Sequence, residues 1–116
     1  MSKVKIFHNP RCSKSRQTLA LLEQQNIEAE IIEYLKAPPT KGQLEDIITM
    51  LNIEPRALLR KGESIYKELG LADLNISNEQ LIQTMCDNPK LIERPIVITN
   101  GKAKIGRPPE SVLAIL

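Results

Sequence analysis

The chain has 116 residues, of which 41% are hydrophobic and 26% are charged, with 16 basic and 14 acidic side chains and a net charge of +2. This length suits one domain around one hydrophobic core, and the composition is that of a globular protein rather than a disordered one. The small and dispersed basic excess argues against binding to nucleic acid or to a membrane surface.

The N-terminal third of the chain predicts a strand, a helix and a second strand. Charged and apolar residues alternate over residues 3–7, which is typical of a strand, and His8-Asn9-Pro10 ends it. We expect a helix from Cys12 or Ser13 to about Gln25, and then a strand over residues 28–34. Because a helix joins the two strands, they should be parallel, with a right-handed crossover.

Prolines, glycines and capping residues then mark out a block of helices. Thr40 and Gln43 form a candidate capping box, and the apolar residues of the helix that follows recur at i, i+3, i+4 and i+7: Leu44, Ile47, Ile48 and Leu51. Two short helices should end at Gly62 and Gly70. Ser77 with Gln80 predicts another cap, and the helix that it begins should end at Asn88-Pro89.

The C-terminal part predicts a hairpin and a last helix. Asn100-Gly101 separates the segments 96–99 and 102–105, and both turn residues tolerate a positive φ. Gly106 and Pro108-Pro109 then lead into the helix.

This order of elements predicts an α/β fold with a thioredoxin-like βαβ…ββα core and a four-stranded mixed sheet. We expect a single domain over residues 1–116, with the core formed by residues 1–35 and 93–116 and a helical insertion over about residues 40–92. By analogy with thioredoxin-like folds, the Arg94-Pro95 peptide bond should be cis, and the proline should face the active-site cysteine.

The expected redox state of the two cysteines follows from the compartment in which we expect the protein. No apolar run approaches the roughly 20 residues that cross a bilayer, and the N-terminus shows no secretory signal. We therefore expect a cytoplasmic protein with reduced thiols, in which Cys12 and Cys86 do not form a structural disulfide.

Cys12 stands where the first strand ends and the first helix begins. The unpaired N–H groups and the partial positive charge of a helix N-terminus stabilise a thiolate, and Arg11, Lys14 and Arg16 add cations nearby. We interpret Cys12 as a nucleophile whose pKa lies below the usual value of about 8.5. A buried structural cysteine is the alternative.

The neighbours of Cys12 restrict its chemistry. Ser15 occupies the place of the second cysteine in a Cys-x-x-Cys motif, so the chemistry is monothiol or is resolved by another molecule. The Ser15 hydroxyl is a candidate hydrogen-bond donor to the thiolate. His8 either tunes the thiolate or orients the loop, or it is a strand-end histidine whose ring is hydrogen-bonded to backbone. Cys86, beside core-type Met85, is interpreted as structural, and one histidine with two separated cysteines predicts no metal site.

Five sequence blocks lie in order along nearly the whole chain: His8-Asn9-Pro10-x-Cys12-x-x-Ser15-Arg16, Arg56-Ala57-Leu58-Leu59-Arg60-Lys61, Tyr66-x-Glu68-Leu69-Gly70-Leu71, Arg94-Pro95-Ile96-Val97 and Gly106-Arg107-Pro108. Together they resemble the ArsC-type arsenate reductase family, which is coupled to glutathione and glutaredoxin and belongs to the ArsC/Spx branch of the thioredoxin-like superfamily. The chain is thereby identified as a short ArsC-like member.

The resemblance implies a reaction and a set of roles. Cys12 matches the catalytic nucleophile, and the oxyanion-binding residues are Arg60, Arg94 and Arg107, with His8 and Ser15 in support. Guanidinium groups offer paired donors that suit a tetrahedral dianion such as arsenate. The family reduces arsenate to arsenite, with glutathione as co-substrate, glutaredoxin as the protein that restores the thiol, and no tightly bound cofactor.

Two alternatives stay open on the sequence. One is an Spx-like transcriptional regulator that binds RNA polymerase; such proteins typically use a Cys-x-x-Cys switch, and Ser15 counts against it. The other is a glutaredoxin-like reductase that acts on protein mixed disulfides.

Overall fold

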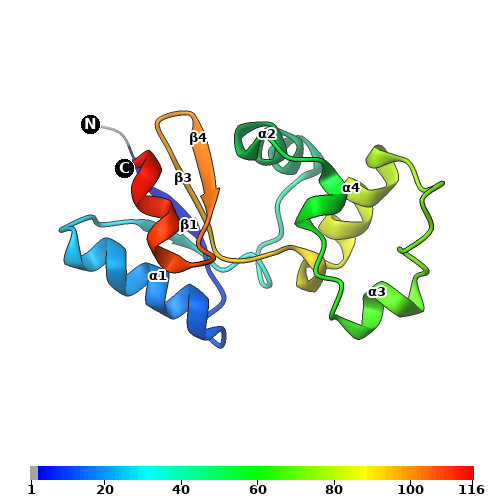
Figure 1. The fold of residues 1–116 in the computed structure, drawn as a ribbon, viewed down its shortest axis with the longest axis horizontal. Helices are drawn as coiled ribbons and strands as arrows, with labels where there is room; N and C mark the ends of the chain where they lie inside the picture. The colour runs from blue at the N-terminus through cyan, green and yellow to red at the C-terminus, as the bar shows by residue number, and fades with distance from the viewer. Residues whose placement is uncertain (1–2) are drawn as a thin grey trace. The chain divides into compact units, whose positions relative to one another are not determined.

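The computed structural model describes residues 3–116, so the first two residues of the predicted domain lie outside the described part of the chain. The chain divides into two compact units, which are coloured by residue number in Figure 1. The sheet unit contains residues 3–37 and Arg94–Leu116, and the helical unit contains Pro38–Glu93. The assignment of both units to a single domain stays a prediction.

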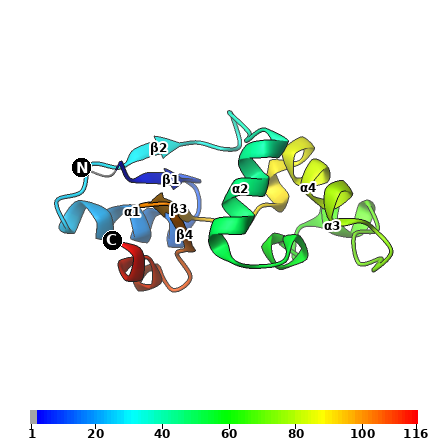
Figure 2. The same ribbon diagram turned by 90° about the horizontal axis from the view of Figure 1, so that it is seen from above.

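Four strands form the sheet, in the order β2-β1-β3-β4 (Figure 2). Strand β1 (Lys5–Phe7) is parallel to β2 (Glu30–Ile32) and antiparallel to β3 (Ile96–Thr99), which pairs in turn with β4 (Lys102–Ile105). The predicted four-stranded mixed sheet is therefore confirmed.

Two helical elements pack side by side on one face of this sheet: α1 (Ser13–Gln24), which joins β1 to β2, and the 3₁₀ helix η3 (Pro109–Ile115), which follows β4 (Figure 1). Ile6 and Val97 are partners in the β1–β3 register and pack with two further buried side chains, Leu22 of α1 and Val112 of η3. Burial of each such side chain stabilises the fold by about 1.5–3 kcal/mol. This layer fixes α1 on the sheet.

Strand β2 is shorter than the predicted segment 28–34. The carbonyl oxygen of Glu33 accepts hydrogen bonds from the N–H groups of Lys36 and Ala37, so the chain turns directly after the strand. Tyr34 then stacks on Phe7, with 6.1 Å between ring centroids and 11° between ring planes. The turn brings Glu33 towards the end of β1.

The helical unit contains α2 (Lys41–Leu51), η1 (Pro55–Leu58), α3 (Ser64–Glu68), α4 (Asn78–Asp87) and η2 (Pro89–Leu91). Helix α4 contacts α2, η1 and η2. Both predicted capping boxes are present, Thr40 with Gln43 and Ser77 with Gln80. The short helix η2 was not predicted, because three residues that begin with a proline give no periodic signal.

The C-terminal segment follows the prediction with two differences. Asn100 and Gly101 form the hairpin turn with φ of 55° and 70°, and the Arg94–Pro95 bond is cis, as expected. Arg107–Pro108 is also cis, which was not predicted. The last helix is 3₁₀ rather than α, since its backbone bonds span three residues, as from the Leu116 N–H to the Leu113 carbonyl.

None of the helices within residues 3–116 combines the length and the apolar character needed to span a membrane.

Candidate active site

Cys12 is the N-cap residue of α1. Its backbone is extended, its N–H donates to the carbonyl oxygen of Asn9 at 3.0 Å, and its own carbonyl accepts from the Arg16 N–H at 3.0 Å. The backbone N–H groups of Lys14 and Ser15 face the sulfur, and the first turn of α1 has no acidic residue. The helix end therefore offers positive charge and donors to a thiolate.

Two arginines of the sheet unit reach the same sulfur. Arg107 Nη2 lies 3.6 Å from Cys12 Sγ, and Arg107 Nε donates to the carbonyl oxygen of Arg94 at 2.8 Å. The Arg94 guanidinium is also hydrogen-bonded to the sulfur. Arg94 precedes β3 and Arg107 follows β4, so the hairpin brings both guanidinium groups to the N-terminus of α1.

These groups together lower the pKa of the Cys12 thiol below its ordinary value. Burial is the largest single influence and raises the pKa, since Cys12 is only 9% exposed. The effect of burial is outweighed by the sum of the groups that lower the pKa: the Ser15 N–H, the hydrogen bond and charge of Arg94, and the Lys14 N–H. We assign the lowering of the pKa to these groups.

Ser15 is buried and bonds to the loop rather than to the thiol. Its Oγ lies 2.7 Å from His8 Nδ1 and accepts a hydrogen bond from the Asn9 N–H at 3.0 Å. The side chain of Asn9 in turn accepts from the Arg11 N–H at 3.0 Å. The sequence left open a bond from the Ser15 hydroxyl to Cys12, whereas in the structure it is the backbone N–H of Ser15 that serves the sulfur.

His8 lies at the end of β1, buried behind the Cys12 loop. Its backbone N–H donates to the Ile32 carbonyl at 2.9 Å, which extends the β1–β2 pairing by one bond. Burial is the main cause that lowers the pKa of His8, and the Arg16 charge adds to it against the opposing charge of Glu33. The lowered pKa favours the neutral imidazole, whose tautomer sets whether His8 Nδ1 or the Ser15 hydroxyl is the donor in their hydrogen bond.

Arg60, the third predicted anion ligand, belongs to the helical unit. Its Nη1 donates to Glu93 Oε1 at 2.7 Å, and its Nε lies 3.7 Å from Glu63 Oε2. Both carboxylates offset its charge within that unit. Its part in anion binding stays a prediction.

Cys86 lies in α4, partly buried beside buried Met85. Burial raises the pKa of its thiol, and the charges of Asp87 and Glu45 raise it further against a smaller effect of Lys41. The two cysteines thus differ in the direction of their pKa shifts. Over residues 3–116, no group of three or more His, Cys, Asp or Glu side chains is arranged to hold a metal ion.

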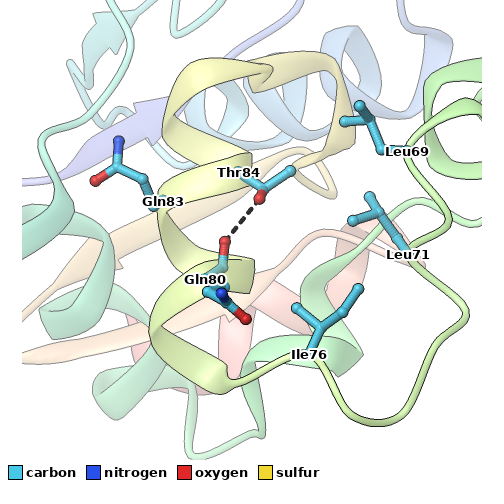
Figure 3. Close-up of a pocket in the computed structure, with 6 residues that line it drawn as sticks. All are labelled: Leu69, Leu71, Ile76, Gln80, Gln83 and Thr84. Carbon is cyan, nitrogen blue, oxygen red and sulfur yellow. Dashed lines mark hydrogen bonds between the residues drawn. The ribbon is translucent and has the colours of Figure 1, made fainter.

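One pocket adjoins the Cys12 loop and another lies on the helical unit. The first, of about 180 Å³, is lined by His8 and by charged side chains of both signs, including Arg11, Glu33 and Lys36. The second, of about 390 Å³, is lined by Leu69, Leu71, Ile76, Gln80, Gln83 and Thr84 (Figure 3). Its lining side chains carry neither a charge nor a thiol.

Sequence reasoning did not single out Asn9, Thr18 or Gly106 as site residues. Asn9 shapes the turn before Cys12 through its carbonyl and its side chain. Thr18 is fully buried although it is polar, and Gly106 lies against it. The signal available for Thr18 was its spacing, because residues 15, 18 and 22 share one helix face.

A model described as the ArsC family matches residues 7–115. An arsenate reductase of Neisseria meningitidis is 49% identical to this chain over 117 residues. The match covers the full length of both proteins. The uncharacterized protein YfgD of Escherichia coli is 56% identical over 114 residues, which cover 97% of this chain and 96% of that protein.

Solved structures show the same fold. An arsenate reductase from Vibrio cholerae superposes with a TM-score of 0.97 at 51% sequence identity, and the match covers 98% of each chain.

Proposed function

Because the chain belongs to the ArsC family, we propose that it is an arsenate reductase in which the Cys12 thiolate attacks arsenate. The arsenate reductase of Neisseria meningitidis matches this chain along its whole length, and one from Escherichia coli, 46% identical, matches it over 82% of its own length. The observation that carries the proposal is the environment of one sulfur: Cys12 Sγ lies at a helix N-terminus, with Arg94 bonded to it and Arg107 at 3.6 Å.

The first chemical step uses these groups directly. Arg94 and Arg107 hold the oxyanion and stabilise the charge that develops on its oxygens, while the N-terminus of α1 keeps the sulfur ionised. A bond forms between Sγ and arsenic(V), and one oxygen of arsenate leaves as water after protonation. Arg60 is proposed as a third ligand of the anion.

The later steps need an outside thiol, because Ser15 stands where a resolving cysteine would be. Glutathione attacks the adduct, arsenic accepts two electrons as the two sulfurs join in a disulfide, and arsenite leaves as arsenic(III). Glutaredoxin then reduces the mixed disulfide and restores the Cys12 thiol. The pocket beside His8 has charges of both signs, which suits the two carboxylates and the ammonium group of glutathione.

His8 and Ser15 act through the loop. Their buried hydrogen bond and the bond from Asn9 hold the turn that leads into Cys12. We propose that both are positioning residues and that neither touches arsenate. We also place the reaction in the cytoplasm, where glutathione and its reductase keep thiols reduced.

The test is arsenate-dependent NADPH oxidation by the purified protein in the presence of glutathione, glutaredoxin and glutathione reductase. Turnover is expected only when all components and arsenate are present. A parallel assay offers a glutathionylated peptide in place of arsenate. Reduction of the peptide without reduction of arsenate would contradict the proposal and favour a thiol-disulfide reductase.

A further inference from the structure

Gly106 lies where the end of β4 meets both α1 and the start of β3. Its N–H donates to the Pro95 carbonyl oxygen at 2.9 Å. A Cβ atom on Gly106 would lie 2.5 Å from Thr18 Oγ1, 2.8 Å from Pro95 Cγ and 3.1 Å from Thr18 Cγ2. Its φ is outside the left-handed region. The glycine is therefore required for space rather than for backbone conformation.

Thr18 and Pro95, the two neighbours of Gly106, are both buried and cannot easily withdraw. Thr18 is fully buried, and its Oγ1 donates to the Lys14 carbonyl oxygen of the same helix at 2.9 Å. Helix α1 is itself fixed on the sheet by Leu22. A side chain at position 106 must consequently push the segment after β4 away from α1, because packed interiors yield little.

That segment carries Arg107, the next residue along the chain. Arg107 Nη2 is 3.6 Å from Cys12 Sγ, and its Nε is bonded to the Arg94 carbonyl. Cys12 and Thr18 belong to the same helix end, at its N-cap and in its second turn. The contact between Gly106 and Thr18 thus sets the separation between the arginine and the sulfur.

We propose that Gly106 and Thr18 are positioning residues, whose close contact holds the Arg107 guanidinium at the Cys12 thiolate. Neither residue touches the anion. The inference rests on the proposed function for the identity of the substrate, but the placement of Arg107 at the thiol can be measured without arsenate chemistry.

The first variant is Gly106→Ala, and its matched control is Gly42→Ala, an exposed position where a Cβ meets nothing within 4 Å. Both are made in Cys86→Ser protein, and alkylation of Cys12 is followed at increasing sulfate or arsenate concentrations. We expect Gly106→Ala to need about ten- to a hundredfold more anion for the same protection, since small displacements at a site have effects of this size. Gly42→Ala should match the parent.

Rescue separates positioning from general loss of structure. Adding Thr18→Ala to Gly106→Ala removes both threonine contacts and should recover part of the anion protection, with the Pro95 contact left. Adding Thr18→Val keeps the bulk at the same place and should recover none. Unchanged protection in Gly106→Ala, or equal recovery by alanine and valine, would overturn the proposal.

Two further outcomes are decisive. If Gly106→Ala does not fold, the double variant Thr18→Ala/Gly106→Ala is measured in its place, and anion protection equal to that of the parent protein would contradict the proposal. If the parent protein does not reduce arsenate but sulfate protection follows the predicted order of variants, the proposed function fails while the positioning role stands.

Discussion

Ser15 Oγ lies 2.7 Å from His8 Nδ1, and both side chains are buried. The same oxygen accepts the N–H of Asn9, so one hydroxyl ties the end of β1 to the turn before Cys12 and to the first turn of α1. The serine that replaces a second cysteine therefore does more than remove a resolving thiol. Its hydroxyl also holds the turn that leads into Cys12.

Ser15→Ala tests this role. It leaves the Asn9 N–H and His8 Nδ1 without the hydroxyl in a buried place, so the free energy of unfolding should fall by about 1–3 kcal/mol. The midpoint pH of Cys12 alkylation should shift little, because Ser15 serves the sulfur through its backbone N–H. Ser13→Ala, in an exposed position of the same turn, is the control for chemical denaturation and should change stability little. A large rise of the alkylation midpoint in Ser15→Ala would show that the hydroxyl does stabilise the thiolate.

His8 predicts a pH dependence of stability. Burial lowers the pKa of His8 in the folded state below the ordinary value of about 6.5, so the unfolded chain binds more protons in this range. The contribution of His8 to the free energy of unfolding should have its full value above about pH 6.5. It should be lost as the pH drops through the pKa of His8 in the folded state. Denaturation at pH 7.5 and pH 5.5 measures the change, and His8→Gln should lessen it.

His8 is the only histidine in the chain, so its imidazole resonances can be followed by NMR without assignment. A folded-state titration midpoint above 6.5 would contradict the prediction, because the sign of the pH dependence would then reverse.

Local patterns were sufficient for most of the fold. The Asn100-Gly101 turn and the two capping boxes were predicted correctly because each depends on residues that are neighbours in sequence. The predicted length of β2 was wrong, because the turn that ends the strand is formed by backbone hydrogen bonds to the Glu33 carbonyl. No residue type in this segment indicates such a turn.

The site was less predictable, since its electrostatics come from distant segments. The sequence pointed to Arg11, Lys14 and Arg16 as the cations beside the thiol. In the structure Arg16 donates to the Pro10 carbonyl at 2.9 Å, and the guanidinium that lowers the pKa of Cys12 is that of Arg94. Only the fold brings Arg94 to Cys12. The contact between Gly106 and Thr18 likewise has no local signature.

Replacement of Arg94, Arg107 or Arg60 by alanine should weaken anion binding. Loss of one charge-assisted partner costs about 1.5–3 kcal/mol, which corresponds to roughly ten- to a hundredfold in affinity. Arg94→Ala and Arg107→Ala should therefore lose most of the protection that sulfate or arsenate gives Cys12, and Arg94→Ala should also raise the midpoint pH of alkylation. Arg60→Ala is expected to weaken protection as well. Lys104→Ala, which removes an exposed cation of β4, is the control. If sulfate and arsenate protect Cys12 in the Arg60, Arg94 and Arg107 variants as well as they do in the parent, the anion binds elsewhere.

The two cysteines should have unequal roles in turnover. Cys12 has a lowered pKa and Cys86 a raised one, so Cys12 is the thiol that ionises more readily. Cys12→Ser should abolish arsenate reduction, because a hydroxyl remains protonated there, whereas Cys86→Ser should keep most activity and lose at most a little stability. With thioredoxin and its reductase alone, turnover should be poor, since Ser15 cannot resolve an adduct, and glutathione with glutaredoxin should restore it. Steady-state rates of both variants under both reducing systems give the answer. Equal loss of activity in Cys86→Ser would mean that an internal disulfide relay replaces the external thiol.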